Sequence, residues 1–441
     1  MVIVFLTGLL QASLFFYCPV FHNNDFCGEY HFLVYWTSMK AFFSSKIILF
    51  ILLVAILGWA MYWFVVFSEK QPEIMEEPAE AALPAPALVP ETTVAEPQKI
   101  IRPLPPPPPP PSMERMKREG CVADGLLNGD FPKDGKTIEL VNNSKCYYLS
   151  RAIETWLEPP DWKDIDENRA KLRADLLPGM FLAEAIDIKR NYYYPDENRD
   201  FDFGDMCRKG SKNFWGEHTC KPSFAREEYR KYVRFITRAA MDRNIQVFLI
   251  GQVYHQDAKD QEDTIVPEVV ADMRQYAAIR GMTIFIGAQT NDIDNPEYLK
   301  LFDFIEGGVG IDAAGNIESG PCFSRWWKKE GDWCWGLLWH ERFAKNARNV
   351  FLHFDWSGKI GDDMSTYTRM DAETRARTVR KLYGYFTERG MGFLLPYVAR
   401  LHVDNGGCYG PAKRYYTPDN RFGCKDEAVM NELLQKARAT P

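Results

Sequence analysis

The sequence predicts an α/β domain whose parallel strands and covering helices close into a (β/α)8 barrel, preceded by a transmembrane helix and a proline-rich linker. Three observations predict this organisation. Residues 47–67 form a run of 21 uncharged residues, residues 105–111 are seven consecutive prolines, and the chain after them repeats the order amphipathic helix, turn, apolar strand. Such alternation is typical of a parallel sheet covered by helices.

Composition excludes several classes of protein. Hydrophobic residues make up 46% and charged residues 26% of the 441 residues, which is close to the globular average and argues against disorder, a collagen-like repeat or a polytopic membrane protein. The net charge is −7 and the sequence has no block of lysine and arginine. We therefore expect no nucleic-acid partner.

The N-terminal part reads as a membrane anchor. At 1.5 Å per residue, the run 47–67 can cross a hydrocarbon core of about 30 Å. Lys40 and Lys46 precede it and four glutamates follow it closely, so residues 39–68 are predicted to be a cytoplasmic stub and signal anchor with the rest of the chain outside. Residues 1–38 are a doubtful leader. Translation starting at Met39 is one reading, and a signal-like or second membrane segment is the other.

Residues 69–118 are predicted to be an extracytoplasmic linker. They are rich in proline, alanine and glutamate, and the seven prolines favour a stiff polyproline II rod that rises ~3.1 Å per residue. A ligand for an SH3-type domain is the competing interpretation of such a run.

The cysteines indicate an oxidising compartment. Neighbouring cysteines beyond the linker are separated by 25, 13, 12 and 16 positions, which favours four local disulfides between sequential partners. The sequence has no CxxC or HxxxH, so no metal and no cofactor are expected. The eight cysteines are Cys121, Cys146, Cys207, Cys220, Cys322, Cys334, Cys408 and Cys424.

The barrel domain is placed at residues 119–441. Four units of helix followed by strand are predicted at 222–244 and 245–250, 267–280 and 282–286, 337–348 and 350–354, and 371–389 and 391–395. Further strands are predicted at 180–187 and 302–306, and one of two unplaced strands is expected near 137–148. No GxGxxG turn is present, so an open nucleotide-binding sheet is disfavoured.

Polar side chains follow nearly every predicted strand. The carboxyl ends of barrel strands meet at one mouth, where barrel enzymes carry their active sites. Because alternate side chains of a strand face inward, His353 and Asp355 share the inner face, while Glu184 and Asp187 cannot both point inward. The strand-end residues are Glu184, Asp187, Gln252, His255, Gln289, Asn291, Glu306, His353, Asp355, Trp356, Tyr397 and Arg400.

Carboxylates gathered with amides and aromatic rings suit cleavage of a glycosidic bond, in which one acid protonates the leaving oxygen and a second carboxylate attacks or activates water. Through FLAEAID, FDFIEGG and FLHFDWSG, and the helix-to-strand repeat from about Met180 to Arg400, the chain resembles the (β/α)8-barrel glycoside hydrolases. The Asn-Glu pair that many of these enzymes carry on their fourth strand is absent, since Ile305 precedes Glu306.

We therefore predict a membrane-anchored, extracytoplasmic glycoside hydrolase acting on polysaccharide or glycoconjugate. Glu306 is the expected general acid/base, Asp355 the nucleophile or water-activating base, and Glu184 the reserve, with the other strand-end residues positioning the substrate. Two alternatives stay open. One is a non-catalytic barrel that binds carbohydrate or a partner, and the other is a metal-dependent deacetylase using His353 and Asp355.

Overall fold

The computed structural model describes residues 105–129, 135–253, 256, 265–289, 296–317, 347–356, 362–401, 406–410 and 412–439. All of them belong to one compact unit of the chain, residues 99–441. The predicted leader, the transmembrane helix at 47–67 and the linker up to residue 104 lie outside the described residues. None of the helices in the described part is long and apolar enough to cross a membrane.

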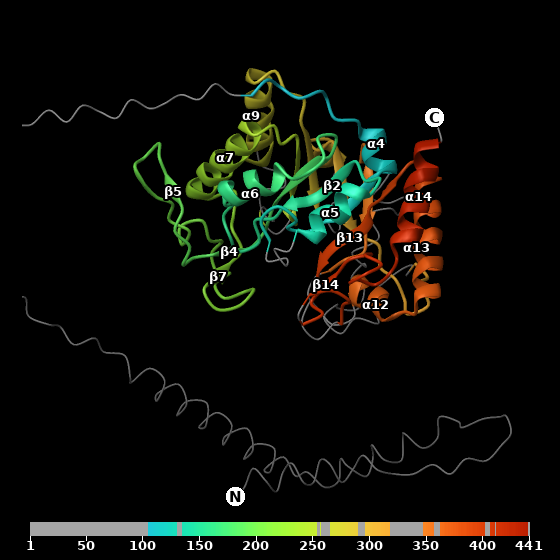
Figure 1. The fold of residues 1–441 in the computed structure, drawn as a ribbon. Coiled ribbons are helices and arrows are strands. Elements are labelled where there is room, and N and C mark those ends of the chain that lie inside the picture. Colours follow the sequence, from blue (N-terminus) through green and yellow to red (C-terminus); the bar gives the residue numbers. More distant parts are fainter. Residues whose placement is uncertain are drawn as a thin grey trace, which may run out of the picture. The chain divides into compact units, whose positions relative to one another are not determined.

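A curled, mainly parallel sheet forms the centre of the fold (Figure 1). Seven parallel strands lie side by side in the order β11, β10, β9, β8, β3, β2, β1. Their bounds are β1 (Gly120–Ala123), β2 (Tyr148–Ile153), β3 (Leu177–Leu182), β8 (Val247–Ile250), β9 (Phe285–Gln289), β10 (Phe304–Gly308) and β11 (Val350–His353).

The two ends of this row share one segment of chain. β12 (Gly392–Phe393) pairs in parallel with β11, and β13 (Leu395–Arg400) pairs in parallel with β1. Leu394 alone separates β12 from β13, and its backbone N–H donates to the Leu352 carbonyl of β11 at 2.8 Å. β14 (Tyr415–Tyr416) then adds antiparallel to β13. The predicted α/β class is confirmed, and its central sheet is curled and mainly parallel.

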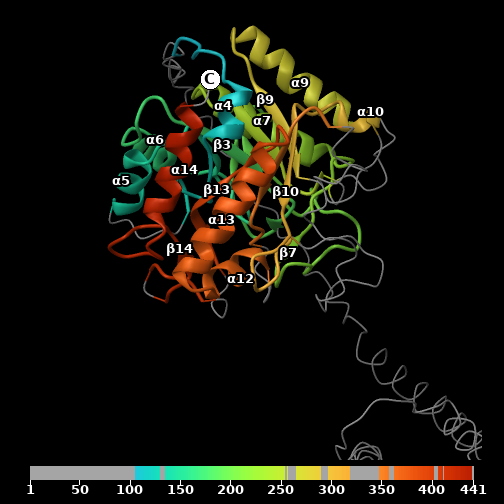
Figure 2. The same cartoon turned by 90° about the vertical axis from the view of Figure 1, so that its right-hand side faces the viewer.

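Helices pack around the outside of the sheet (Figures 1 and 2). In α7 the buried residues Tyr229, Val233, Ile236 and Ala240 recur with the helical period, so one stripe faces the sheet. The helices are α4 (Met113–Arg118), α5 (Lys136–Asn143), α6 (Trp162–Arg169), α7 (Glu227–Asp242), α9 (Ile265–Ile279), α10 (Pro296–Leu299), α12 (Asp363–Arg369), α13 (Ala372–Thr387) and α14 (Glu427–Ala439).

The strands separate two hydrophobic clusters. The larger one fills the space between the sheet and the helices, and the smaller, here called the inner cluster, contains the alternate side chains that face the concave side of the sheet. Tyr148, Phe181, Leu249, Phe304 and Phe351 contribute to the inner cluster from five different strands. Residues of the same parity further along each strand must therefore face the same interior.

All six predicted strands are present, displaced by a few residues at their ends. The expectation of a strand near 137–148 is wrong, since residues 136–143 form α5 and the strand begins at Tyr148. Thr137, Leu140 and Val141 are buried in α5 at helical spacing, which explains the correction. The predicted helix at 337–348 falls almost wholly outside the described residues.

Three of the four predicted disulfides are confirmed. Cys121 is bonded to Cys146, Cys207 to Cys220, and Cys408 to Cys424. Cys322 and Cys334 lie outside the described residues. The bonded pairs are 25, 13 and 16 positions apart in sequence, so each disulfide closes a short loop.

The described end of the proline-rich segment lies against the domain. The carbonyl oxygen of Pro106 accepts a hydrogen bond from the Asn244 side chain, and that of Pro109 accepts one from the Gln246 side chain, both at 3.1 Å. At its end, the Ser112 N–H donates to the Tyr147 hydroxyl at 3.2 Å. Asn244 and Gln246 come just before or at the start of β8, so this segment, here called the docked proline segment (residues 105–112), runs along the edge where the strands begin.

Candidate active site

A bulge in β2 places two consecutive polar side chains in the interior. The register of β2 against β3 shifts between Leu149 and Ile153, and Arg151 has a φ of +59°. Bulges re-aim side chains and are frequent beside active sites. Here the Ser150 hydroxyl reaches Glu306, while the Arg151 guanidinium lies 3.7 Å from the centroid of the Phe181 ring. Both side chains therefore face the concave side.

Glu306 lies at the centre of the interior. Its side chain is fully buried, and the Ser150 hydroxyl lies 2.9 Å from Oε1 and 3.1 Å from Oε2. Burial raises the pKa of Glu306 to about 7, against the opposing effects of the Ser150 hydrogen bond and the Arg151 charge. Close to neutral pH this carboxyl therefore exists in both protonation states.

His353 is the nearest basic side chain to Glu306. Its Nε2 lies 3.7 Å from Glu306 Oε1, and its Nδ1 lies 3.0 Å from the Phe354 carbonyl oxygen. Since a carbonyl oxygen can only accept, Nδ1 carries the proton and Nε2 faces Glu306 with a lone pair. Burial lowers the pKa of His353 to about 4, so the ring is neutral at pH 7. The prediction that His353 faces inward is confirmed.

Asp355 lies further toward the mouth than Glu306. Gly308 follows Glu306 by two residues on the same face of β10, and a Cβ added to Gly308 would lie only 2.6 Å from the Cβ of Asp355. The Asp363 carboxylate accepts hydrogen bonds from the backbone N–H groups of Asp355, Gly310 and Ile311 at 2.9 to 3.1 Å. Asp363, in α12, thereby ties the ends of β10 and β11 together.

Arg151 is the central cation of this interior. It donates two hydrogen bonds to Glu154 Oε2, from Nε at 3.0 Å and from a terminal nitrogen at 2.6 Å, and Asp124 Oδ1 lies 4.0 Å away. Burial and the nearby Asp124 raise the pKa of Glu154 to about 8 in spite of Arg151. The Arg151 charge also acts on Glu184, Glu306 and His353, which shows that the polar groups of several strands lie within electrostatic reach of one guanidinium.

Glu184 follows β3 at the carboxyl end of the sheet. Its side chain is 2% exposed, and burial raises its pKa to about 7. Its Oε2 is buried and has no hydrogen-bond partner among the described residues. This oxygen lies against Gly251 at the end of β8, where any side chain would collide with it. An unsatisfied buried carboxyl oxygen is costly unless a ligand completes its hydrogen bonds.

Glu184 and Asp355 follow strands on opposite sides of the curled sheet. Counted through β10, β9 and β8, strand β3 is the fourth strand from β11. It is also the fourth when the count goes the other way, through the β12–β13 segment, β1 and β2. Trp356, which follows Asp355, packs its ring 4.7 Å from the His353 ring, and the Arg151 guanidinium lies 4.7 Å from the Trp356 ring. The same guanidinium also stacks on Phe181 of β3, so it bridges the two sides.

Two further predicted residues lie at neighbouring strand ends. Gln289 ends β9 and is buried. Gln252 follows β8, is buried, has a φ of +30°, and its Oε1 has no hydrogen-bond partner within the described part of the chain. Both residues therefore lie at the carboxyl end of the sheet, as Glu184 does. His255 and Asn291 lie outside the described residues.

Three predicted residues are not brought together with this group. Tyr397 faces the helices, because its hydroxyl donates to Asn431 of α14 at 3.2 Å. Asp187 lies in the short strand β4 (Ile186–Asp187), with Oδ2 3.5 Å from the Arg190 Nε. Arg400 is exposed at the end of β13.

Sequence reasoning missed Asp124, Ser150, Arg151 and Glu154. Their strands were the two left unplaced, and the bulge at Arg151 interrupts the alternation by which an inward face is recognised. The available signal is the pair Ser150-Arg151 inside the otherwise apolar run YYLSRAI. Two adjacent polar residues within a buried strand are what a bulge accommodates.

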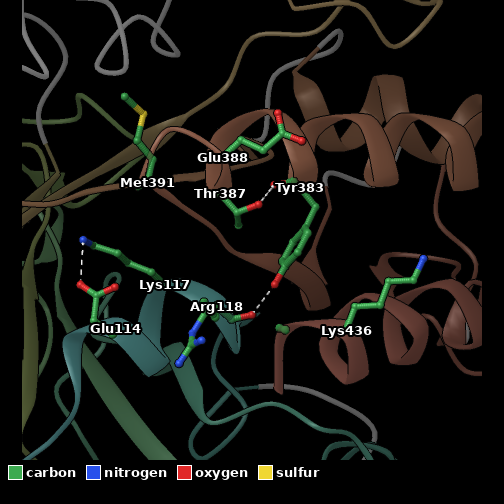
Figure 3. Close-up of a pocket in the computed structure, with 10 residues that line it drawn as sticks. Glu114, Lys117, Arg118, Tyr383, Thr387, Glu388, Met391 and Lys436 are labelled. Atoms are coloured by element: carbon green, nitrogen blue, oxygen red, sulfur yellow. Dashed lines mark hydrogen bonds and ion pairs between the residues drawn. The ribbon is translucent and has the colours of Figure 1, made fainter. Parts of the chain in front are cut away.

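A pocket of about 380 Å³ lies elsewhere, between α4, α13 and α14 (Figure 3). There Lys117 is paired with Glu114 at 3.2 Å, and the Tyr383 hydroxyl donates to the Arg118 carbonyl at 2.6 Å. Because α4 precedes β1 and Met391 precedes β12, this pocket lies at the end of the sheet where strands begin. It is separate from the group formed by Glu184, Glu306 and Asp355, here called the carboxyl cluster.

No protein-family model matches the chain, and no curated protein matches its sequence. The solved structures to which it is similar are glycoside hydrolases. A GH27 β-L-arabinopyranosidase from Geobacillus stearothermophilus is 10% identical over 44% of this chain and 53% of its own, with a TM-score of 0.29. Isomalto-dextranase from Arthrobacter globiformis is 11% identical over 74% and 57%, with a TM-score of 0.40.

The glycoside hydrolase domain of PelA from Pseudomonas aeruginosa is 12% identical over 67% of this chain and 96% of its own, with a TM-score of 0.35. The chain spans about half the length of the arabinopyranosidase and of the isomalto-dextranase. All three TM-scores are below 0.5, so these similarities carry no argument about function.

Proposed function

We propose that the curled sheet is a (β/α)8 barrel and that the protein is a membrane-anchored, extracytoplasmic glycoside hydrolase acting on polysaccharide or glycoconjugate. One observation carries the proposal. Glu184 is a buried carboxyl at the carboxyl end of the sheet, its pKa is raised to about 7, and its Oε2 has no hydrogen-bond partner in the described part of the chain. A general acid needs a proton held near neutral pH and an oxygen directed at the substrate.

The carboxyl cluster supplies both halves of the reaction. Protonated Glu184 gives its proton to the glycosidic oxygen as the bond to the leaving sugar breaks, and Asp355 on the opposite side attacks the anomeric carbon or takes a proton from the attacking water. Glu306, expected from the sequence to be the acid, lies further from the carboxyl ends of the strands than Asp355 and accepts a hydrogen bond from the Ser150 hydroxyl. We therefore exchange the roles of the two glutamates and propose Glu306 as a positioning residue.

Arg151 assists by stabilising the deprotonated form of the glutamates in the carboxyl cluster. Its guanidinium lies between the rings of Phe181 and Trp356 and acts on both Glu184 and Glu306. A fixed cation beside a protonated glutamate favours the carboxylate left after proton transfer. It therefore stabilises the transition state more than the ground state, which is the requirement for catalysis.

The proposed location rests on the sequence and the disulfides. The uncharged run 47–67, with lysines before it and glutamates after it, supports an anchor whose C-terminal side is outside the cytoplasm. The three disulfides of the described part of the domain are typical of an oxidising compartment.

The test is hydrolysis of a polysaccharide panel by the full-length chain, followed as release of reducing ends. Glu184→Gln and Asp355→Asn are each expected to lower kcat/KM roughly 10²–10⁴-fold without lowering the unfolding midpoint. The matched control is Glu158→Gln, at an exposed residue that pairs with Arg190 on the surface. Near-normal turnover in both site variants would reject the assignment.

Binding without hydrolysis by the wild-type chain would instead favour the non-catalytic barrel. Release of acetate that a chelator abolishes, without release of reducing ends, would favour the metal-dependent deacetylase. Among the described residues no group of three or more His, Cys, Asp and Glu side chains is arranged to hold a metal ion.

A further inference from the structure

The disulfide-closed loop at residues 207–221, here called the basic loop, is fastened beside Glu184. Its strand β7 (Thr219–Cys220) pairs antiparallel with β4, in the register Ile186 with Cys220. Ile186 follows Glu184 by two residues. The Cys207–Cys220 disulfide and the hydrogen bond from the Trp215 N–H to Thr219 Oγ1 at 3.0 Å hold the tip of the loop. Figure 1 shows β4 and β7 together beyond the sheet, at the end opposite α4.

Three aromatic rings form a row from the interior to the tip of this loop. Trp156, which packs partly against the inner cluster, meets Trp215 edge-to-face with ring centroids 5.1 Å apart. Trp215 meets Phe214 at 4.7 Å, and Phe214 is 54% exposed. The backbone N–H of Trp156 donates to Glu154 Oε1 at 3.0 Å, so the inner end of the row adjoins the Arg151 network.

Trp215 has an unused donor. Its indole Nε1 is buried and has no hydrogen-bond partner among the residues that the structure describes. A tryptophan N–H in a folded protein normally finds an acceptor. A ligand oxygen lying against this ring would supply one.

Lys221 places a cation beside the same rings. The residue is 9% exposed, and its Nζ lies 3.6 Å from the centroid of Phe214 and 5.7 Å from that of Trp215. No ion pair joins its ammonium to a carboxylate within the described ranges, although its charge acts on Glu184. An anionic ligand group beside these rings would form a charge-assisted hydrogen bond with this ammonium.

The basic loop as a whole is also positively charged, which favours an anionic ligand. Residues 207–221 contain four basic side chains and one acidic side chain, Glu217, in a chain whose net charge is −7. A local positive field at the rim of an acidic protein raises the local concentration of anionic substrates.

We infer that the basic loop is a subsite for an acidic saccharide, one whose sugar units bear carboxylate groups. The sugar packs against Phe214 and Trp215, whose rings stand edge-to-face, the Trp215 indole N–H donates to a sugar oxygen, and the Lys221 ammonium pairs with the carboxylate. The inference rests on the proposed function in placing substrate beside Glu184, and it adds the charge of the sugar. Neutral glycans would stack on the rings but leave the ammonium unpaired.

The test measures binding of the full-length chain to uronic-acid hexamers of several kinds and to neutral hexamers of the same length, by titration calorimetry. At least one uronic-acid hexamer is expected to bind about tenfold more tightly than every neutral one at ~0.05 M salt, and the difference should narrow at ~0.3 M. Equal affinity for neutral and acidic hexamers would overturn the inference. So would a preference for sulfated hexamers or single-stranded DNA over every uronic-acid hexamer.

Three variants locate the binding. Lys221→Gln is expected to weaken uronate binding about tenfold and neutral binding little, whereas Trp215→Ala should weaken both about tenfold. Lys209→Gln, which removes an equal charge from an exposed position of the same loop, is the matched control and should change affinity by less than about twofold. Equal losses in the two lysine variants would mean that diffuse charge, not this subsite, binds the sugar.

Because affinity and hydrolysis are measured in separate assays, the two proposals fail separately. Tight uronate binding that depends on Lys221, with no hydrolysis of any polysaccharide, would reject the hydrolase and keep the subsite. Hydrolysis of neutral polysaccharides alone would keep the hydrolase and reject the subsite.

Discussion

Replacing Glu306 by glutamine is expected to stabilise the fold near pH 8 and to change little near pH 4.5. Burial raises the pKa of Glu306 from the ordinary 4.5 to about 7 in the folded protein. Between these values the folded state keeps a proton that the unfolded chain has released, so stability falls as the pH rises through this window and the loss is complete above pH 7. At ~1.4 kcal/mol per pH unit, the interval corresponds to about 3 kcal/mol.

The glutamine removes this loss without removing the hydrogen bond. Its amide oxygen can still accept from the Ser150 hydroxyl, which lies 2.9 Å from Oε1 in the wild type. We therefore expect a gain of ~1–3 kcal/mol in the free energy of unfolding near pH 8, somewhat below the full interval because the new amide N–H groups need partners.

Urea unfolding followed by tryptophan fluorescence measures this gain at the two pH values. Glu217→Gln, whose side chain is 84% exposed, is the control and should be neutral at both. No gain near pH 8, or the same gain at both pH values, would refute the reasoning, because the folded protein would then not hold the extra proton.

Three more outcomes follow from the site. Arg151→Met should cost ~1–3 kcal/mol of unfolding free energy, because the Glu154 side chain loses the two hydrogen bonds that Arg151 donates to it, and adding Glu154→Gln should then change the stability little further; urea titration of the single and double variants checks this. Changing Cys207 and Cys220 to serine should cost ~3 kcal/mol and weaken uronate binding, as read by thermal unfolding and calorimetry. The pH profile of kcat/KM should fall above about pH 7, where Glu184 loses its proton, and a profile flat to pH 9 would contradict its role as the acid.

Much of the fold could be predicted because its signals are local. α13 begins after Asp371, whose carboxylate accepts a hydrogen bond from the Thr374 N–H at 2.8 Å, and Gly390 follows its end with a φ of +73°. The disulfides join neighbouring cysteines. The inward position of His353 needed only the alternation of one regular strand.

The remainder depends on contacts between distant parts of the chain. β1 has four residues, too few to show a period, and the bulge that turns Ser150 toward Glu306 joins residues 156 positions apart. Tyr397 looked like a mouth residue because it follows an apolar run. It faces outward because Leu394, three residues earlier, is the one that belongs to the inner cluster.

The docked proline segment sets where the folded unit begins. Pro106 and Pro109 offer carbonyl oxygens to side chains at the start of β8, and proline suits this role because it keeps an acceptor while lacking an N–H of its own to satisfy. Eight residues of the predicted linker thus pack against the domain. The part of the linker that can extend freely is therefore shorter by about 25 Å, at ~3.1 Å per residue. A chain shortened for crystallisation should therefore start before Pro105. Replacing the prolines by glycine and serine would expose Asn244 and Gln246, and would not only make the linker more flexible.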